Sequence, residues 1–547
     1  MKKIILFTFV ISLLFVACKN TEHKTDSEDD KKNESYTSDY KHVELSPDLS
    51  NLSVNDKEMV KIFIEISKYI DTMFFYEAYG NYTDFDTIKN EKLLERITHN
   101  FGPWDRFNEN KPFVKNIKDK PLGANFYPSD ITKEELVKSN MDSLQNRILL
   151  PYTFVRRDSS NNLYSIKYNN FFENYVSKIS ELLIKASELS ENKDFANYLK
   201  LRADAILTDN YTESDLAWLK LKTNKLDFVV GPVTIYEDKL LNKKAEHQSY
   251  VLIKNNEWCN KTEKYDKWLP FLQKAIPVGE QYRKEEPGTH SNIYIYEAIY
   301  LGGSSTAGGI MLSLMQPLDS KIRLENGSRN LQFKNIIEYK FQEIAKPISE
   351  LIIVKEQQKN IKKEAFFTNT VLYEIANSLG IRNTIDGKGT VREALKENFT
   401  ISDILKNYVL SLFLAEKLYE VGEITNELEE NYTTFVVNIL RVLRFGITDN
   451  YAKANLICFN YFQENGAIEY SDNQTIKINF EKMKELTSQL TQIIITTQGD
   501  GDYQATADFF KKYGTISNEL QKIINKTNTL NIPKDITLNQ GVDVLGI

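Results

Sequence analysis

The sequence predicts a mixed α/β protein in which an N-terminal part with strands precedes a mainly helical C-terminal part. Residues 226–236 and 250–254 are rich in β-branched and aromatic side chains, which is typical of strands. From about residue 336 onward, apolar residues recur at intervals of three and four, the spacing of an amphipathic helix. Hydrophobic residues make up 41% of the chain and charged residues 27%, as in folded globular proteins.

The predicted elements follow one another along the chain without an internal repeat. Helices are expected at 55–74 and 174–189, and a loop rich in Gly, Pro and Asn is expected over 100–131. Further strands are expected at 293–301 and 310–314, on either side of a glycine-rich turn. The C-terminal helices are expected at 336–359, 365–380, 391–397, 401–420, 425–445, 480–497, 503–511 and 516–526.

The first 18 residues have the pattern of a lipoprotein signal peptide. Lys2 and Lys3 precede an apolar run, 4–17, that is shorter than the about 20 residues a transmembrane helix needs. The run ends in Ala17-Cys18, which resembles a bacterial lipobox, in which the cysteine is lipidated and becomes the mature N-terminus. The alternative is an ordinary secretory signal followed by a chance cysteine.

The segment after the signal, residues 19–52, is polar and charge-mixed, so we expect a disordered tether. The body then consists of a mixed α/β lobe with a β-core, residues 53–335, and a mainly helical lobe, residues 336–547. Signal and tether together predict a bacterial cell-envelope protein. We expect an N-terminal lipid to anchor it in the outer membrane, facing the periplasm or the cell surface.

Charge, histidine and cysteine content exclude several classes of function. A net charge of −7 lacks the basic surface that nucleic acid requires, so we expect no nucleic-acid partner. The chain has five histidines and none after His290, which excludes a histidine-ligated metal centre or a Ser-His-Asp triad built from the C-terminal half. Beyond the signal, Cys259 and Cys458 are favoured as two unpaired thiols, with a disulfide as the alternative.

Two loop motifs and two histidines carry little functional signal. The glycine-rich segment 302–309 lacks the spacing of a P-loop or a dinucleotide fold, so a tight turn is expected. The segment 498–502 contains two aspartates but not the other ligands of a calcium loop, so a turn between helices is expected. His247 and His290 are isolated in sequence, which favours core or surface roles over catalysis.

Short blocks spread along most of the chain carry a family signature. They are FGPWDR (101–106), KPF (111–113), GANFYP (123–128), DFVVGPVTIYED (227–238), LENGSRNLQFKN (324–335), GKGTVREALKE (387–397), YTTF (432–435), RFG (444–446), KAN (453–455) and QGDGDY (498–503). In content, order and spacing they resemble the dipeptidyl peptidase III-like (M49) zinc metallopeptidases, especially their shorter bacterial branch. The resemblance extends over essentially the whole body after the tether.

The resemblance implies a two-lobed fold, in which a lobe with a β-core lines a peptide cleft and a helical lobe carries the metal. It also implies a zinc-dependent peptidase that removes short peptides from an N-terminus or hydrolyses related amides. In this branch an HExxH helix supplies two zinc-binding histidines one turn apart, with the intervening glutamate as general base.

The zinc positions that the resemblance implies are degenerate in this chain. Tyr373 and Asn377 stand at the histidine positions, and the general base is retained as Glu374. Ile404 stands at the third ligand position, and Tyr451 where the family has a histidine that stabilises the transition state. A phenol with a pKa of about 10, a carboxamide and an alkyl group are poor zinc ligands. We therefore expect no zinc and no other cofactor, which leaves Glu374 without an activated water.

One alternative keeps a metal in the helical lobe. Glu374 together with Asp403, Glu393 or Glu397 would form a rebuilt carboxylate site for a harder cation. The chain would then be an active peptidase or hydrolase.

The substrate side of the resemblance is mixed. Family members bind the peptide N-terminus partly through an acidic residue and a tyrosine on the Gly-Pro strand. Tyr236 is retained, whereas Thr234 stands at the acidic position. Trp104, Arg106 and Asn125 belong to the signature and either line the cleft or maintain its architecture; we favour architecture.

The leading hypothesis is a lipid-anchored relative that is inactive as a zinc peptidase and binds a peptide or a protein partner in the cleft. The alternatives are the active hydrolase with a carboxylate metal site and a structural surface lipoprotein that keeps the fold as a scaffold. An open cleft favours the first hypothesis, and a filled or closed cleft favours the scaffold.

Overall fold

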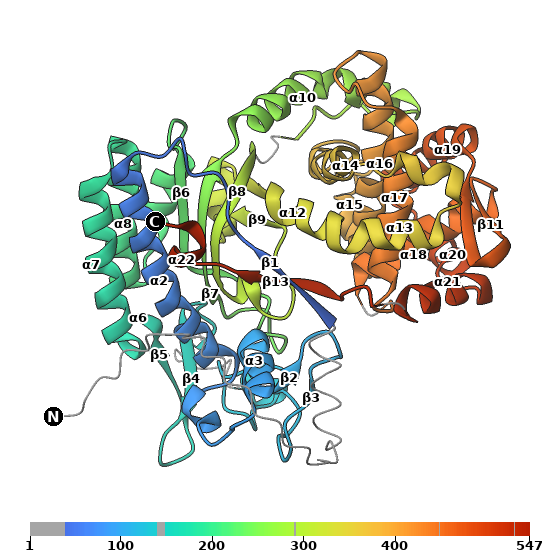
Figure 1. The fold of residues 1–547 in the computed structure, drawn as a ribbon. Helices are drawn as coiled ribbons and strands as arrows, with labels where there is room; N and C mark the ends of the chain where they lie inside the picture. The colour runs from blue at the N-terminus through green and yellow to red at the C-terminus, as the bar shows by residue number, and fades with distance from the viewer. Residues whose placement is uncertain (1–38, 139–147, 289–291, 448, 530) are drawn as a thin grey trace, which may run out of the picture.

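The protein consists of two lobes (Figure 1). The structure, a computed structural model, describes residues 39–138, 148–288, 292–447, 449–529 and 531–547. The first lobe, at the left and bottom of Figure 1, contains the central sheet, and the helical lobe lies at the upper right. Each lobe has its own hydrophobic core. The predicted two-lobed, mixed α/β fold is confirmed.

A five-stranded sheet forms the centre of the first lobe. Its strands are β6 (Leu226–Thr234), β7 (Glu246–Lys254), β8 (Asn292–Gly303), β9 (Ser313–Gln316) and β10 (Arg329–Phe333). They lie in the order β6-β7-β8-β10-β9, antiparallel except for the parallel pair β8 and β10. Every residue of β6 is buried, because both faces of the sheet are covered at this strand. This explains why its sequence is a nearly continuous apolar run rather than an alternating one.

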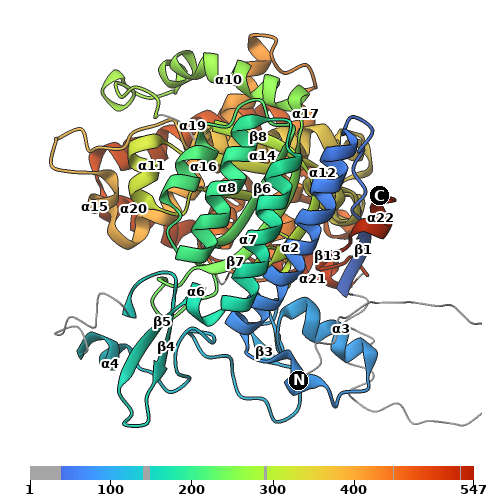
Figure 2. The ribbon, with the colours of Figure 1, turned by 90° about the vertical axis from the view of Figure 1, so that its left-hand side faces the viewer.

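A layer of helices shields the sheet. The long helix α2 (Val54–Ala78) begins with a capping box between Ser53 and Asp56 and contacts β7 and β8. Phe63 of α2 stacks on Phe228 of β6, with ring centroids 4.2 Å apart. The helices α7 (Glu173–Leu189) and α8 (Lys193–Thr208) continue this layer beside α2 (Figure 2).

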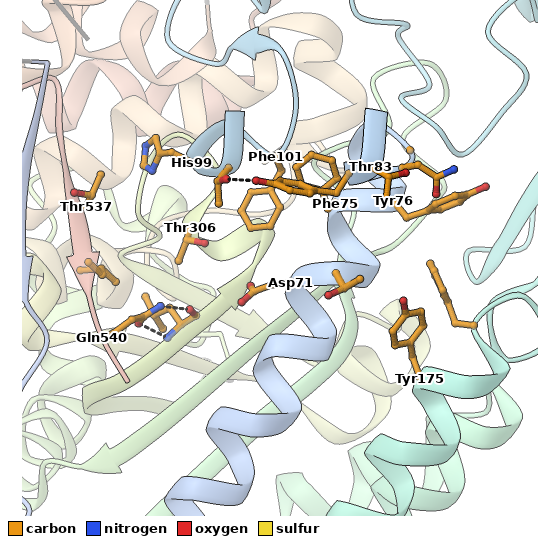
Figure 3. A pocket seen from close by; sticks show the side chains of 18 of the residues that line it. Asp71, Phe75, Tyr76, Thr83, His99, Phe101, Tyr175, Thr306, Thr537 and Gln540 are labelled. Atoms are coloured by element: carbon orange, nitrogen blue, oxygen red, sulfur yellow. Dashed lines mark hydrogen bonds between the residues drawn. The ribbon is translucent and has the colours of Figure 1, made fainter. Parts of the chain in front are cut away.

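A cavity of about 690 Å³ lies beside the C-terminal half of α2 (Figure 3). It is bounded by α3 (Glu91–Asn100), by α6 (Tyr168–Phe171) with α7, and by β13 (Asp535–Asn539). The strand β13 pairs in parallel with β1 (Tyr40–Glu44), so both ends of the described chain belong to the first lobe.

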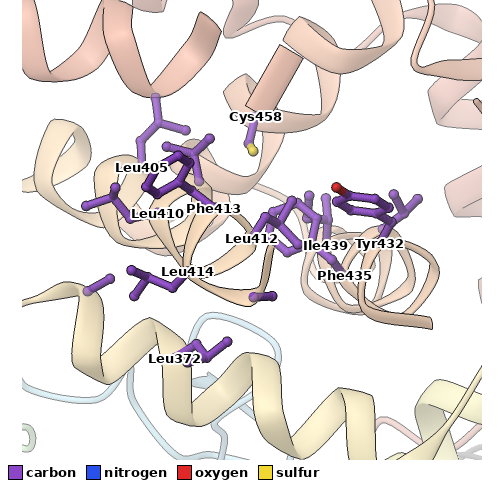
Figure 4. Close-up of a cluster of buried hydrophobic side chains, with 14 of the residues drawn as sticks. Leu372, Leu405, Leu410, Leu412, Phe413, Leu414, Tyr432, Phe435, Ile439 and Cys458 are labelled. Atoms are coloured by element: carbon purple, nitrogen blue, oxygen red, sulfur yellow. The ribbon is translucent and has the colours of Figure 1, made fainter. Parts of the chain in front are cut away.

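The helical lobe is organised around α16 (Phe399–Glu420), which is buried along most of its length. Leu410, Leu412 and Leu414 point in different directions around this helix and are all fully buried, as expected for a central helix (Figure 4). Its main neighbours are α14 (Lys363–Ala376), α17 (Leu428–Leu443), α18 (Asn450–Glu464) and α19 (Phe480–Asp500).

The remaining elements flank these two centres. The helices are α4 (Lys133–Lys138), α9 (Thr212–Leu219), α10 (Asn256–Ala275), α11 (Ser320–Asn326), α12 (Lys334–Lys340), α13 (Lys346–Ile352), α15 (Val391–Leu395), α20 (Tyr503–Tyr513), α21 (Asn518–Thr529) and α22 (Val542–Leu545). Small strand pairs are β2 (Trp104–Asp105) with β3 (Lys111–Pro112), β4 (Thr153–Arg157) with β5 (Leu163–Lys167), and β11 (Ile468–Ser471) with β12 (Thr475–Ile478). Both α10 and α12 contact β8 and a helix of the helical lobe, so they join the two lobes.

Most predicted helices and strands are confirmed, with shifted boundaries. The predicted helix 336–359 is divided, because the π-helical turn Phe341–Ala345 separates α12 from α13. Pro347, at the start of α13, has no N–H to donate to the preceding turn, which explains a break at this point. The helices α8, α10 and α18 were not predicted from the sequence.

The tether prediction is corrected at its C-terminal end. Residues 1–38, with Cys18 and the signal, lie outside the described residues. Residues 40–44 form β1, because Tyr40 and Val43 are buried and the backbone pairs with β13 from the other end of the chain. Within the described ranges, no helix combines the length and apolar character that crossing a bilayer requires.

Several smaller predictions are also resolved. Cys259 and Cys458 are buried and free, which confirms two unpaired thiols. Gly303 lies in the predicted tight turn with φ 68°, and a Cβ there would overlap the backbone of His247. His247 itself has a core role, since its Nδ1 lies 2.6 Å from Oε1 of the buried Glu77. His290 is outside the described residues.

Candidate functional site

Two of the three side chains at the predicted zinc-helix positions line one small cavity. Tyr373 and Glu374 lie in the last turn of α14, and Asn377 follows directly as the C-cap residue. A cavity of about 250 Å³ faces Tyr373 and Glu374, and Tyr451 of α18 also lines it. Its other walls come from α16, α17, β9 and β10, so it lies where the helical lobe meets the sheet.

Glu374 is held by neutral carboxamides. Asn330 Nδ2 donates to Glu374 Oε2 at 2.7 Å, and Asn377 Nδ2 lies 3.4 Å from the same oxygen. Burial raises the pKa of Glu374 to about 7, although hydrogen bonds from Asn330 and Gln332 favour the charged form. The carboxyl group therefore gains or loses its proton near neutral pH. A general base works best when its pKa lies in this range.

The tyrosines of this cavity keep their protons. Tyr373 and Tyr408 pack with ring centroids 4.8 Å apart, and the Tyr373 hydroxyl hydrogen-bonds to that of Tyr451. Burial raises the pKa of Tyr373 far above its ordinary value, and the neighbouring tyrosines and Glu374 raise it further. Burial also raises the pKa of Tyr451. Neither phenol is available as a phenolate ligand at neutral pH.

Asn377 has both ends of its carboxamide engaged. Asn407 Nδ2 of α16 donates to Asn377 Oδ1, while Asn377 Nδ2 faces Glu374. An amide pair between two helices thus occupies a position where the resemblance implies a zinc-binding histidine.

The other acids of the predicted carboxylate metal site do not gather around Glu374. The prediction of this site is therefore corrected. Asp403 pairs with Lys406 at 2.8 Å, and Glu393 belongs to the N-terminal capping box of α15. Glu397 accepts a hydrogen bond from Tyr503 at 2.5 Å. Each carboxylate has a local partner, which explains why the four acids do not converge. Among the described residues, no three His, Cys, Asp or Glu side chains form a group that could hold a metal ion.

The donor set around Glu374 does not fit zinc. Ile404 is only 7% exposed and packs in the helical core, where an alkyl side chain supplies no ligand. The other two positions offer a protonated phenol and an engaged carboxamide, whereas zinc is bound by imidazole, thiolate or carboxylate. Glu374 alone supplies a chemically suitable donor.

A second cavity, of about 530 Å³, lies over the β-core. Tyr236, which is 59% exposed, and the buried Glu246 both line it. The Thr234 hydroxyl donates to Glu246 Oε1 at 2.5 Å, and the backbone N–H groups of Tyr236 and Glu237 donate to the same carboxyl group. Burial raises the pKa of Glu246 to about 7 despite these hydrogen bonds. Thr234 stands where the resemblance implies an acidic residue, and the carboxyl group of Glu246 lies beside it on the neighbouring strand.

Glu246 was not predicted from the sequence, because only the register of β6 against β7 places it opposite Thr234. Asn330 and Gln332 were also not predicted as partners of Glu374. Their spacing of two within LENGSRNLQFKN places them on one face of β10, a signal that could have identified them.

Arg106 belongs to a buried charge cluster at the edge of the second cavity. Its guanidinium forms a two-pronged pair with Glu237, at 2.7 and 3.1 Å, and Lys120 also pairs with Glu237. Burial alone would raise the pKa of Glu237, but Arg106 and Lys120 outweigh it and lower the pKa to about 2. The cluster fixes the 101–128 segment to the end of β6.

Trp104 and Asn125 have architectural contacts. Trp104 is buried, and its Nε1 donates to the backbone oxygen of Lys118 at 2.8 Å. Asn125 Nδ2 donates to the backbone oxygen of Tyr76 at 2.8 Å. Neither residue lines the cavity near Tyr236 or the cavity near Glu374.

The two cavities adjoin along the segment that enters β9. Gly309 and Met311 line the larger one, and Leu312 and Ser313 line the smaller one. Burial raises the pKa of Tyr236, and Tyr451 and Glu374 are near enough to contribute. The structure therefore brings Tyr236 and Thr234 of the first lobe close to Tyr373, Glu374 and Tyr451 of the helical lobe.

We predict that Glu374→Gln changes how stability depends on pH. The folded protein holds the Glu374 proton up to about pH 7, whereas the unfolded chain loses it near its ordinary pKa of 4.5. The stability that this proton contributes is therefore present at low pH and is lost as pH rises through about 7. Gln stays neutral, so between pH 5 and pH 8 the variant should gain about 2 kcal/mol relative to the wild type. Urea unfolding across this range measures the difference.

The control is Glu469→Gln, which removes an exposed carboxylate on β11. Its profile should run parallel to that of the wild type. If the Glu374→Gln profile is parallel as well, Glu374 titrates as it does in water and its burial is misassigned.

Comparisons with known proteins found relatives in sequence and in structure. No protein-family model matches the chain. It is 27% identical to Nudix hydrolase 3 of Arabidopsis thaliana, across 91% of this chain and 72% of that protein. The structure of dipeptidyl peptidase III from Corallococcus sp. strain EGB aligns with a TM-score of 0.80 and 26% identity, covering 94% of this chain and 98% of that one.

The structure of dipeptidyl peptidase III from Caldithrix abyssi is more similar still. It aligns with a TM-score of 0.90, covering 93% of this chain and 99% of that one. At 30% sequence identity over this length, with the same two-lobed fold, the chain belongs to the dipeptidyl peptidase III (M49) family.

Proposed function

We propose that this protein is a zinc-independent member of its family that binds a peptide, or a peptide segment of a partner protein, between its lobes. The observation that carries the proposal is the environment of Glu374. Its carboxyl group is bound by Asn330 and Asn377 rather than placed beside metal ligands. A metal acidifies its bound water from a pKa of about 15.7 toward about 7, and without it a buried carboxyl group is a weak catalyst of peptide hydrolysis.

The two adjoining cavities support the binding part of the proposal. Their volumes are about 530 and 250 Å³, so there is room for several side chains of an extended peptide. Met311 and Phe107 provide apolar wall, and Tyr236 and Glu246 provide polar groups close to each other. This combination favours a ligand-binding protein over a scaffold, for which the cavities would serve no purpose.

The carboxyl group of Glu246 is the feature best suited to a peptide amine. It lies next to the exposed Tyr236 and replaces the acid that is absent at Thr234. An ammonium group would favour its charged form and would offset the burial that raises its pKa to about 7.

Membrane anchoring through Cys18 is the third part of the proposal, supported by the signal pattern of residues 1–18. In bacteria fed a palmitate analogue, the wild-type protein should carry the label and sediment with the envelope. Cys18→Ala should carry no label and should lose the membrane association. Retention of Cys18→Ala in the membrane fraction would argue against the lipid anchor.

We predict that purified protein contains far less than one zinc per chain and releases no dipeptide from arylamide substrates. Metal analysis and a peptidase assay on the same preparation measure both quantities. The triple variant Tyr373→His, Asn377→His and Ile404→Glu should take up zinc, since it restores two imidazoles and a carboxylate. Tyr373→His alone is the matched control and should not, because it leaves only one added ligand.

Two results would overturn this part. One zinc per wild-type chain together with turnover would show an active metallopeptidase. A triple variant that folds, as judged by circular dichroism, but takes up no zinc would show that the metal positions are wrongly assigned.

We predict that short peptides with a free N-terminus raise the melting temperature of the wild-type protein more than their N-acetylated forms do. Tyr236→Ala should reduce the affinity at least fivefold, because Tyr236 lines the cavity beside Glu246. Its side chain is 59% exposed, so the substitution should leave the fold intact. Tyr164→Ala, which removes a tyrosine that is 41% exposed on β5, is the control and should bind like the wild type. Equal stabilisation by both peptide forms would exclude an amine-binding site.

A further inference from the structure

The cavity beside α2, of about 690 Å³, shares no lining residue with the cavity near Tyr236 or the cavity near Glu374. Its walls come from α2, the connection from α2 to α3, the start of α7 and the strand β13 (Figure 3). It is therefore a separate site that the proposed function does not use.

Aromatic rings dominate the walls of this cavity. They belong to Phe75 and Tyr76 of α2, to Tyr82 and Phe101 at the ends of the following segment, and to Phe171 and Tyr175 beside them. In Figure 3, Phe75 and Phe101 lie above Asp71, and Tyr175 lies across α2 from it. The faces of aromatic rings attract cations electrostatically, and several rings around one space are typical of sites for organic cations.

Asp71 is the only carboxylate among the lining residues that the structure describes, and no lysine or arginine is among them. Its Oδ1 accepts the Gly303 N–H at 2.6 Å, and its Oδ2 accepts a long hydrogen bond of 3.4 Å from the Tyr300 hydroxyl. A carboxylate has about four acceptor positions, so two of them remain for a ligand. The imidazole of His99 does not compete as a cation, because burial lowers its pKa to about 4.

We propose that this cavity binds a small organic cation, an amine with an apolar or aromatic body, whose ammonium group pairs with Asp71. The aromatic walls take up the apolar body, and the single acid selects for positive charge. An anion would meet a like charge, and a neutral ligand would leave the charge of Asp71 without an opposite charge beside it, which costs free energy in a site removed from water. Burial raises the pKa of Asp71 to about 7, so the negative charge of Asp71 is disfavoured while the cavity is empty. A cationic ligand beside Asp71 would stabilise that negative charge.

The test uses three probes of similar shape in isothermal titration calorimetry at pH 8. They are phenethylamine, which is cationic, 2-phenylethanol, which is neutral, and 3-phenylpropanoate, which is anionic. The wild-type protein should bind phenethylamine at least tenfold more tightly than 2-phenylethanol and should show no measurable binding of 3-phenylpropanoate. Equal affinity for the amine and the alcohol, or no binding of the amine, would overturn the proposal.

Asp71→Asn separates the charge from the shape of the site. Asn retains an oxygen that can accept the Gly303 N–H, so the variant should keep its binding of 2-phenylethanol and lose the tenfold preference for the amine. Asp204→Asn removes the same charge from an exposed position on α8 and should leave the preference unchanged. A preference that survives Asp71→Asn contradicts the role of Asp71.

Tyr175→Ala provides a second test in case Asp71→Asn does not fold. It removes one aromatic wall and leaves Asp71 in place, so the affinity for phenethylamine should fall at least fivefold. An unchanged affinity would place the amine outside this cavity. Peptide binding near Tyr236 should not respond to either variant, so the outcome here is independent of the proposed function.

Discussion

The buried pair of Asp535 and Lys340 is the contact on which the arrangement of the two lobes depends. Asp535 Oδ2 accepts from Lys340 Nζ at 2.8 Å and from the Ile310 N–H at 3.0 Å. Lys340 ends α12, where the chain enters the helical lobe, Ile310 follows the turn after β8, and Asp535 begins the C-terminal strand β13. Both charged side chains are at most 7% exposed, and such a pair is tolerated only when its hydrogen bonds are complete. One carboxylate therefore joins the central sheet, the helical lobe and the paired chain ends.

This junction sets the environment of Glu374. With the lobes held together, β10 of the sheet presents Asn330 to the last turn of α14, and α16 presents Asn407 to Asn377. The result is a polar network in which a carboxyl group is satisfied by amides and lies beside protonated phenols. In this network, Tyr373 and Asn377 stand at the two positions where the resemblance implies zinc-binding histidines.

The sequence predicted more of the fold than of the candidate site. The family blocks and the periodicities of α2, β6 and α16 are local patterns, and they predicted the lobes and most elements. The fixed spacing of a known motif also pointed to Tyr373, Glu374 and Asn377, which the structure places together at the end of α14. Glu246 was not, because it follows Thr234 by twelve residues and reaches it only through the register of two strands. Strand pairing and helix packing depend on contacts between distant residues, which local patterns do not encode.

The sequence by itself determined which side chains the helical lobe offers for chemistry, since the chain has no histidine after His290. Only the tertiary structure decided where the remaining carboxyl groups act. It placed Asp71 in a cavity lined by aromatic rings and Glu246 beside Tyr236, and it gave Asp403, Glu393 and Glu397 partners of their own. The physical reason is that residue type fixes which bonds a side chain can form, whereas its surroundings fix the cost of its charge and the partner that offsets it.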